Sequence, residues 1–252
     1  MPTVILLRHG RTTANASGVL AGRLPGTRLD ATGEQQAETA AARLAVLPLA
    51  ALVSSPQERC QQTAGYVVRA IGASREEPAL LTDDGLAECD YGEWQGRALK
   101  DLAGEDLWKV VQRQPSAAEF PGGESLRAMQ QRAVDAVRRR DQQIAADHGP
   151  GAVWLAVTHG DIVKAVLADA LGMHLDLFQR LHADPASLTI VRYGDARPTV
   201  LQSNSHAGDL TWLIPPPPAA DAAASAGAED DAAVGGGAGP GVPVPAAVPP
   251  SP

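Results

Sequence analysis

Short runs of consecutive apolar residues alternate with helical patterns along most of this chain, and this alternation constrains the fold more than any other feature. Residues 3–7 (TVILL), 50–55 (AALVSS) and 152–158 (AVWLAVT) are each typical of a strand buried on both faces. A segment with helix signals follows each run. The pattern predicts an α/β fold, namely a three-layer α/β/α sandwich with a mostly parallel central sheet.

The other elements are expected where helix and turn signals occur. The expected helices cover residues 30–47 with Thr32 as N-cap, 56–72 between Pro56 and Gly72, 124–149, and 161–172. Two late strands are expected at residues 187–193 and 199–205, on either side of a turn.

The composition changes abruptly at Pro215. Residues 215–252 hold ten of the 20 prolines, four acidic residues and no lysine or arginine. Such a segment cannot bury enough apolar surface to offset the entropy lost on ordering. We therefore expect one folded domain over residues 1–214 and a disordered, acidic tail rich in proline, alanine and glycine over residues 215–252.

Charge and composition narrow the classes of partner. The net charge of -8 argues against nucleic acid or an anionic membrane as a general partner. No apolar run approaches the ~20 residues of a membrane span, and the amino terminus resembles a first strand more than a signal peptide. Two cysteines make no disulfide framework, which fits a reducing compartment. We expect a cytoplasmic protein and leave its oligomeric state open, a dimer included.

Basic and imidazole side chains follow three of the predicted strands. Arg8 and His9 follow the first, Ser55 and Arg59 follow the second, and His159 follows the third. One such residue alone is usually structural or solvated, but the three strand ends together are hard to attribute to chance. In open α/β sheets, ligands bind beyond the carboxyl ends of the strands. Guanidinium groups match phosphate oxygens and histidine can attack phosphorus, so we expect an anion site that contains a nucleophile.

Five motifs occur in the order LLRHGRT, SSPQERCQQTA, LAECDYGEWQG, PGGES and VTHG. Together they resemble the histidine phosphatase superfamily, the phosphoglycerate-mutase-like group that acts through a phosphohistidine. The resemblance extends over roughly residues 3–206 and is strongest to a poorly characterised actinobacterial branch named as phosphomutases or phosphatases. It implies a phosphoglycerate-mutase-like fold, a small phosphomonoester as substrate, and no metal or cofactor.

The resemblance also implies five catalytic residues. His9 matches the nucleophile, Arg8 and Arg59 match the phosphate-binding arginines, His159 matches the histidine that holds the transferring phosphoryl group, and Glu88 matches the proton donor.

Other positions are matched more loosely. Thr12 and Asn15 lie where the family often adds contacts to the phosphate or substrate. Arg11 stands where many members have glutamate, and we expect it at the substrate rim or in solvent. Ser125 and Leu126 are further rim candidates.

The two cysteines adjoin predicted catalytic residues, Cys60 beside Arg59 and Cys89 beside Glu88. They are interpreted either as small buried hydrophobic residues or as sites of oxidative inhibition.

The chemistry of phosphoryl transfer sets two pKa requirements. His9 must be neutral to attack, and the nearby arginines disfavour its protonated form. Glu88 must keep a proton near neutral pH, so its pKa must rise. The acids that are close in sequence would push it upward: Asp83, Asp84, Asp90 and Glu93.

The reaction type depends on whether water reaches the site. Cofactor-dependent mutases of the family carry a closing insertion after the YGxxQG-type loop, whereas residues 97–120 of this chain form a short connection. An open site favours water as acceptor, so we predict a phosphatase. The alternatives are a phosphoglycerate-type mutase and a non-catalytic protein that binds a phosphorylated ligand.

Overall fold

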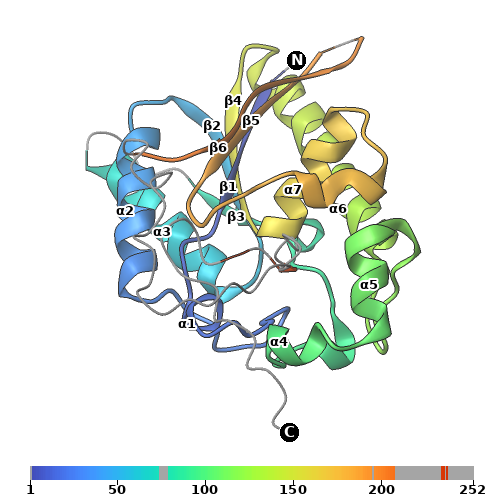
Figure 1. Ribbon diagram of the computed structural model, residues 1–252. Helices are drawn as coiled ribbons and strands as arrows, with labels where there is room; N and C mark the ends of the chain where they lie inside the picture. Colours follow the sequence, from blue (N-terminus) through green and yellow to red (C-terminus); the bar gives the residue numbers. More distant parts are fainter. Residues whose placement is uncertain (1, 74–78, 195, 208–233, 236, 238–252) are drawn as a thin grey trace, which may run out of the picture.

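A computed structural model describes residues 2–73, 79–194, 196–207, 234, 235 and 237. Within them lies a sheet of six strands with helices on both faces (Figure 1). The strands are β1 (Thr3–Arg8), β2 (Leu49–Ser54), β3 (Leu80–Thr82), β4 (Val153–Thr158), β5 (Leu188–Tyr193) and β6 (Pro198–Ser205). The α-helices are α1 (Thr13–Ala16), α2 (Ala31–Leu44), α3 (Glu58–Gly72), α4 (Leu99–Leu102), α5 (Asp106–Arg113), α6 (Leu126–His148) and α7 (Gly160–Ala170). Short 3-10 helices are η1 (Asp84–Leu86), η2 (Gly92–Trp94), η3 (Pro115–Ala117) and η4 (Leu175–Arg180).

The strand order is β3-β2-β4-β1-β5-β6. β1 to β4 are mutually parallel where they pair, and β5 and β6 are antiparallel to their neighbours. The predicted three-layer α/β architecture with a mostly parallel sheet is thus confirmed. β3 was not predicted, because it has only three residues and two of them are exposed.

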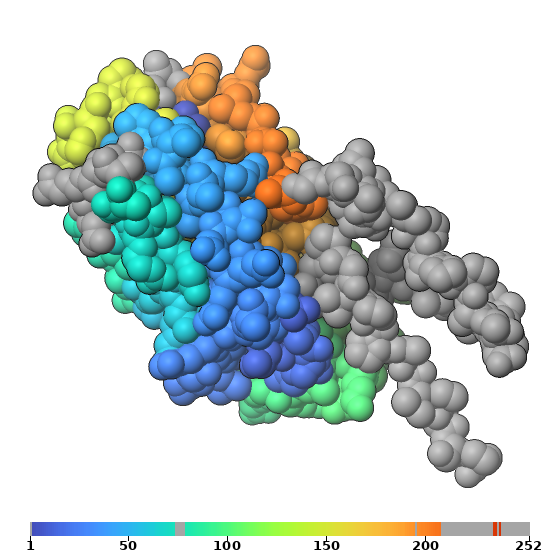
Figure 2. Space-filling model, turned by 90° about the vertical axis from the view of Figure 1, so that its left-hand side faces the viewer, coloured from blue at the N-terminus to red at the C-terminus, as the bar shows by residue number. Residues whose placement is uncertain are grey.

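Alternate residues of the strands feed two separate cores. On β1, Val4 and Leu6 face the core shared with α6 and α7, whereas Ile5 and Leu7 face the core shared with α2 and α3. Figure 2 shows the outer side of the helical layer formed by α2 and α3, where the blue surface of α2 lies beside the cyan surface of α3. Burial on both faces explains why the strands are continuous apolar runs in the sequence.

The helix boundaries agree with the sequence signals apart from one cap. Asp30, not Thr32, is the N-cap of α2, since its side chain accepts a hydrogen bond from the Gly33 amide at 2.8 Å. Thr32 lies inside the first turn of α2 and instead accepts a hydrogen bond from Arg11. Gly149 ends α6 at a φ of 83°, as expected for a glycine in that position.

The expected disordered tail falls almost wholly outside the described residues. The exceptions are Val234, Gly235 and Gly237, and Val234 is buried. No helix in the described ranges is both long and apolar enough to span a membrane.

Two glycines allow the start of α2 to lie directly against the loop that follows β1. A Cβ atom at Gly33 would lie 1.9 Å from the Arg11 carbonyl oxygen, and one at Gly10 would lie 2.3 Å from the Gly33 carbonyl oxygen. Because both obstructing atoms belong to the backbone, no side chain can move aside. The loop that carries His9 is therefore held by a contact between main chains.

We predict that Gly33→Ala destabilises the fold by about 1–3 kcal/mol, because the added methyl forces the two main chains apart. Urea unfolding measures the change. Gly151→Ala is the matched control, since a Cβ at Gly151 meets no atom within 4 Å. Equal free energies of unfolding for the two variants would contradict the proposed close contact.

Candidate active site

The sheet order brings three of the predicted strand ends to one edge. β2, β4 and β1 are adjacent, with Arg8 opposite Thr158 and Ser54 opposite Val157. The His9 amide continues the ladder by donating to the Thr158 carbonyl at 2.9 Å. The expectation that these strand ends meet is confirmed.

His9 has one ring nitrogen committed to the backbone and one left as an acceptor. Its Nδ1 lies 2.7 Å from the carbonyl oxygen of Gly10, so Nδ1 carries the proton. The Nε atom of Arg59 then donates to the unprotonated Nε2 of His9 at 3.2 Å. The His9 and His159 rings lie 5.3 Å apart between centroids. This geometry leaves Nε2 as the nucleophilic atom.

Arg59 connects the two histidines. Its Nη2 atom donates to the Gly22 carbonyl at 2.8 Å and lies 3.0 Å from Nδ1 of His159. Its Nη1 atom is buried and makes no hydrogen bond to any residue within the described ranges. A buried donor without a partner costs free energy, so this atom favours a ligand that supplies an acceptor.

Arg8 precedes His9 in the chain and is fully buried. Its Nη1 atom donates to the Ala183 carbonyl at 2.8 Å. Burial lowers the pKa of the Arg8 guanidinium to about 10, against the opposing influence of Glu88 and Asp184, so it remains charged at neutral pH. Two buried cations, Arg8 and Arg59, therefore act on the imidazole of His9.

His159 is the N-cap of α7. Because its Nδ1 accepts from Arg59, its Nε2 carries the proton and donates to Ser55 Oγ at 2.7 Å or Gln57 Oε1 at 3.0 Å. Ser55 was identified in the sequence by its place after a strand, whereas Gln57 was missed. The available signal for Gln57 was its position two residues before Arg59 in the same loop.

Burial has the largest effect on the pKa values of His9 and Glu88. The pKa of His9 is lowered well below 6.5 by burial, then by Arg59 and Arg8. The pKa of Glu88 is raised from 4.5 to about 7 by burial and then by Asp161, while Arg59 opposes the shift. Both directions agree with the sequence analysis, which identified the arginines correctly.

The source of the Glu88 shift differs from the expectation. Of the acids close to Glu88 in sequence, Asp83 is committed to Arg139 and Arg140 at 2.9 and 2.7 Å. The neighbouring carboxylate that matters most is Asp161, which the sequence analysis did not assign. Its signal was its place immediately after the VTHG motif.

The backbone at Glu88 is held by two arginines. Arg132 on α6 donates to the carbonyl oxygens of Ala87 and Glu88 at 2.7 and 2.9 Å, and Arg23 donates to the same Glu88 carbonyl at 2.8 Å. Glu124, in the PGGES motif, pairs with Arg132 at 2.6 Å and with Arg23 at 2.9 Å. This network, which the sequence did not predict, holds the main chain at Glu88, whose carboxyl group accepts a hydrogen bond from the Cys89 amide at 2.9 Å.

Thr12 and Asn15 bond to each other at the start of α1. The Thr12 hydroxyl accepts from the Asn15 amide at 3.1 Å, and the Asn15 side-chain oxygen accepts from the Thr12 amide at 3.1 Å. This reciprocal cap gives both residues a structural role, and their contact with a phosphate stays a prediction.

Three further positions have structural partners. Arg11 is 21% exposed and pairs at 2.8 Å with Asp30, the residue that caps α2, and its place at the rim or in solvent stays a prediction. Ser125 is partly exposed and caps α6 by accepting from the Ala128 amide, and its place at the rim also stays a prediction. Leu126 is 1% exposed in the core, so the expectation that it lies at the rim is wrong.

Both cysteines are fully buried. Burial raises the pKa of the Cys60 thiol to about 12 and that of Cys89 well above 9.0. Because the thiolate is the reactive form, these environments favour the interpretation as small buried hydrophobic residues over that of oxidation sites.

The predicted catalytic side chains lie below the surface of the protein. The five residues are at most 3% exposed: Arg8, His9, Arg59, Glu88 and His159. Residues 97–120 contribute α4 and α5, whose Leu102 and Val111 are fully buried. The open site expected from this short connection stays a prediction.

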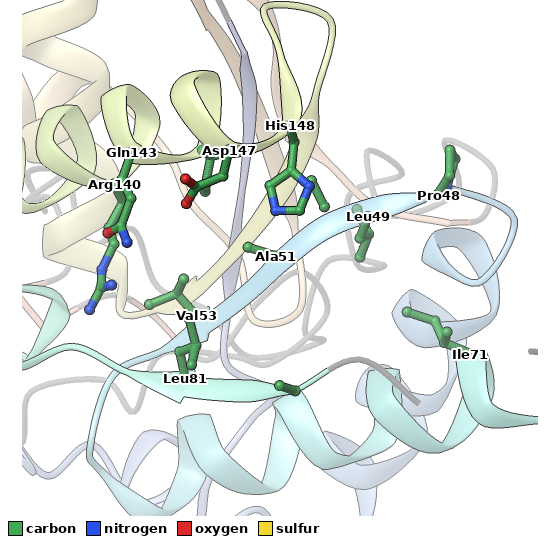
Figure 3. Close-up of a pocket in the computed structure, with 13 residues that line it drawn as sticks. Pro48, Leu49, Ala51, Val53, Ile71, Leu81, Arg140, Gln143, Asp147 and His148 are labelled. Carbon is green, nitrogen blue, oxygen red and sulfur yellow. The ribbon is translucent and has the colours of Figure 1, made fainter. Parts of the chain in front are cut away.

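One hollow of the described surface lies away from these residues. A cavity of about 530 Å³ lies between the end of α6 and strands β2 and β3. Figure 3 shows Arg140, Gln143 and His148 of α6 on one side and Leu49 and Leu81 on the other. None of the predicted catalytic residues lines this cavity. In the described part of the chain, no group of three or more histidine, cysteine, aspartate or glutamate side chains could hold a metal ion.

The comparisons with known proteins agree with this fold. The sequence model of the histidine phosphatase superfamily (branch 1) matches residues 4–206. The chain therefore belongs to this superfamily. The structure of the Bacillus stearothermophilus protein YhfR superposes with a TM-score of 0.70 at 28% identity, over 80% of this chain and 96% of that one.

Curated relatives include both phosphatases and mutases. A bifunctional protein of Mycobacterium tuberculosis is 35% identical over 202 residues, which are 78% of this chain and 52% of the relative. The chain spans about half the length of the mycobacterial relatives it matches. Phosphoserine phosphatase 1 of Hydrogenobacter thermophilus is 28% identical over 83% of this chain and 96% of its own length. A 2,3-bisphosphoglycerate-dependent phosphoglycerate mutase of Thermoplasma acidophilum is 27% identical over 76% and 87%, respectively.

The raised pKa of Glu88 predicts a pH-dependent stability. The folded protein keeps this proton up to about pH 7, whereas the unfolded chain releases it near 4.5. The stabilisation is therefore complete below pH 4.5 and is lost as the pH rises through 7. When the pH rises from 5 to 8, we expect the free energy of unfolding of wild type to fall by on the order of 3 kcal/mol more than that of Glu88→Gln.

Urea unfolding at several pH values measures this difference. Glu38→Gln, on the exposed face of α2, serves as the control and should follow wild type. Parallel stability curves for wild type and Glu88→Gln would show that Glu88 has an ordinary pKa.

Proposed function

We propose that this protein is a metal-independent phosphomonoester hydrolase that acts on a small phosphorylated metabolite through a phosphohistidine at His9. The observation that carries the proposal is the unprotonated Nε2 atom of His9, which accepts a hydrogen bond from Arg59 in a ring that burial, Arg59 and Arg8 keep neutral by lowering its pKa. An imidazole poised in this way can attack phosphorus, and the arginines compensate the charge on the phosphoryl oxygens. In many phosphatases a metal ion compensates the charge on the phosphoryl group. In this protein we assign that task to Arg8 and Arg59.

The first half-reaction forms the phosphoenzyme. Nε2 of His9 attacks phosphorus, the bond to the ester oxygen breaks, and the leaving alkoxide takes the proton of Glu88. A carboxyl group with a pKa of about 7 still holds that proton in a large fraction of molecules at neutral pH. His159 and the unpartnered Nη1 of Arg59 are assigned to the oxygens of the transferring group.

The second half-reaction returns the enzyme to its starting state. The Glu88 carboxylate accepts a proton from water, the water oxygen attacks phosphorus, and the bond to Nε2 of His9 breaks. Inorganic phosphate leaves, and Glu88 is protonated again for the next turnover. The clamp of Arg23 and Arg132 on the Glu88 carbonyl supports this double use of one carboxyl group, because it holds the side chain in place.

A phosphomutase is the second candidate, because the catalytic side chains are at most 3% exposed. Exclusion of water favours return of the phosphoryl group to an alcohol. Relatives named as phosphoserine phosphatase and as phosphoglycerate mutase are both compatible with a small phosphomonoester. The location that we propose is the cytoplasm, with no nucleic acid or membrane as partner.

We predict that His9→Ala lowers the hydrolysis of p-nitrophenyl phosphate by about 10³-fold or more, because the nucleophile is lost. His148→Ala, an exposed histidine at the end of α6, should retain wild-type activity. Wild-type activity is also expected to persist in excess EDTA. Retention of hydrolysis by His9→Ala would remove the phosphohistidine route.

Phosphatase and mutase are separated by where the phosphoryl group goes. Wild-type protein is supplied with 3-phosphoglycerate and catalytic 2,3-bisphosphoglycerate, and both free phosphate and 2-phosphoglycerate are measured. A panel of small phosphomonoesters is tested in parallel for phosphate release. We expect phosphate release from the panel to exceed isomerisation. Faster formation of 2-phosphoglycerate would reverse the assignment, and binding without any turnover would favour a non-catalytic role.

A further inference from the structure

Two described residues of the C-terminal segment, Val234 and Gly235, pack against the folded domain. Val234 is 2% exposed and belongs to the same apolar core as Leu20 and Tyr91. The amide of Gly235 donates a hydrogen bond to Oδ2 of Asp161 at 3.1 Å. The short red segment in Figure 1 lies close to the amino end of α7, where Asp161 is located. This segment therefore has a defined contact with the folded domain.

Asp161 places that contact beside the catalytic groups. It follows His159 by two residues, is 1% exposed, and is the carboxylate with the largest influence on Glu88. Tyr91 donates to the same Oδ2 atom at 2.7 Å, and Lys164 donates to Oδ1 at 3.2 Å. Gly235 and Tyr91 thus share one buried carboxylate, which lies two residues after His159 in the chain.

The fit is specific for glycine. Gly235 has a φ of +74°, a conformation that side chains other than glycine rarely adopt. A Cβ atom at this position would lie 2.6 Å from Cδ1 of Leu20. A non-specific contact would require neither the positive φ nor the lack of a side chain, and Gly235 combines both.

We propose that the C-terminal segment at Val234–Gly235 docks in cis on the leaving-group side of the catalytic site and competes with the substrate. The inference rests on the proposed phosphomonoester hydrolysis. The alcohol part of a phosphomonoester would occupy space beside Asp161, which Gly235 now contacts.

The strength of the contact is modest. The contact consists of one buried valine side chain and one hydrogen bond, and the entropy lost on ordering the segment opposes it. Covalent attachment compensates, because a tethered segment acts at an effective concentration in the millimolar range. Substrate at sufficient concentration therefore displaces it, so the expected effect is competitive inhibition of about three- to tenfold.

The test compares Gly235→Val with wild type in the full-length protein, using p-nitrophenyl phosphate. Valine cannot occupy the Gly235 position, so we expect KM to fall about three- to tenfold with kcat unchanged. Gly151→Val is the matched control, because a side chain there meets no atom within 4 Å, and its KM should equal that of wild type. An unchanged or raised KM for Gly235→Val overturns the proposal, and a raised KM would mean that the segment assists binding.

A peptide supplies the same contact in trans. A synthetic peptide of residues 230–239 (DDAAVGGGAG) is added at millimolar concentration to the Gly235→Val protein. We expect it to raise KM without changing kcat, and the same peptide with valine at position 235 to have no effect. An equal effect of the two peptides on KM would contradict a binding site that is specific for glycine at position 235.

Binding of benzylphosphonate separates this inference from the proposed function, because this probe carries a group in the place of the alcohol part and has no ester bond to hydrolyse. Isothermal titration calorimetry of Gly235→Val and wild type needs no turnover. Tighter benzylphosphonate binding by Gly235→Val in a protein that hydrolyses no phosphomonoester would support the docked segment and reject the hydrolase. Normal hydrolysis with equal benzylphosphonate affinities and equal KM values would reject the docked segment and leave the hydrolase intact.

Discussion

The site depends on the burial of two guanidinium groups beside one imidazole. Arg8 and Arg59 are at most 3% exposed, and each uses part of its hydrogen-bonding capacity on backbone carbonyls of distant segments. Burying two like charges together is unfavourable unless an anion can join them. The same two charges, together with burial, keep His9 neutral. The arrangement is therefore stable enough to persist but is completed electrostatically by a bound phosphate.

The carboxyl groups around this cationic centre divide into two kinds. Glu124 and Asp83 are paired with arginines of α6, and these pairs lower their pKa values despite partial burial. Glu88 is buried without a paired arginine side chain of this kind, and its pKa rises to about 7 because of burial and Asp161. One fold thus holds permanently ionised carboxylates as structural anchors and one carboxyl group that can exchange a proton near neutral pH.

The sequence predicted the features that depend on local pattern and on order along the chain. The apolar runs identified β1, β2 and β4, and the parallel topology then placed His9, Arg59 and His159 at one edge. Features created by contacts between distant segments were not accessible in this way. Asp161, on α7, raises the pKa of Glu88 only because the fold brings distant parts of the chain together. Arg132, on α6, likewise donates to the Glu88 carbonyl although the two residues are far apart in sequence. The cap at Asp30 was missed because Thr32 is an equally acceptable capping residue by composition. Val234 was missed because its segment carries no apolar periodicity, and a single valine and glycine form the contact.

The proposed mechanism depends on transfer of the phosphoryl group to Nε2 of His9. This transfer can be tested by rapid quenching of wild-type protein with p-nitrophenyl phosphate, followed by peptide mass spectrometry and ³¹P NMR of the denatured phosphoprotein. We expect one phosphoramidate, labile to acid and stable to base, on His9 and attached through Nε2. A phosphoryl group on another residue, on Nδ1 of His9, or on no residue while substrate is being turned over would contradict it.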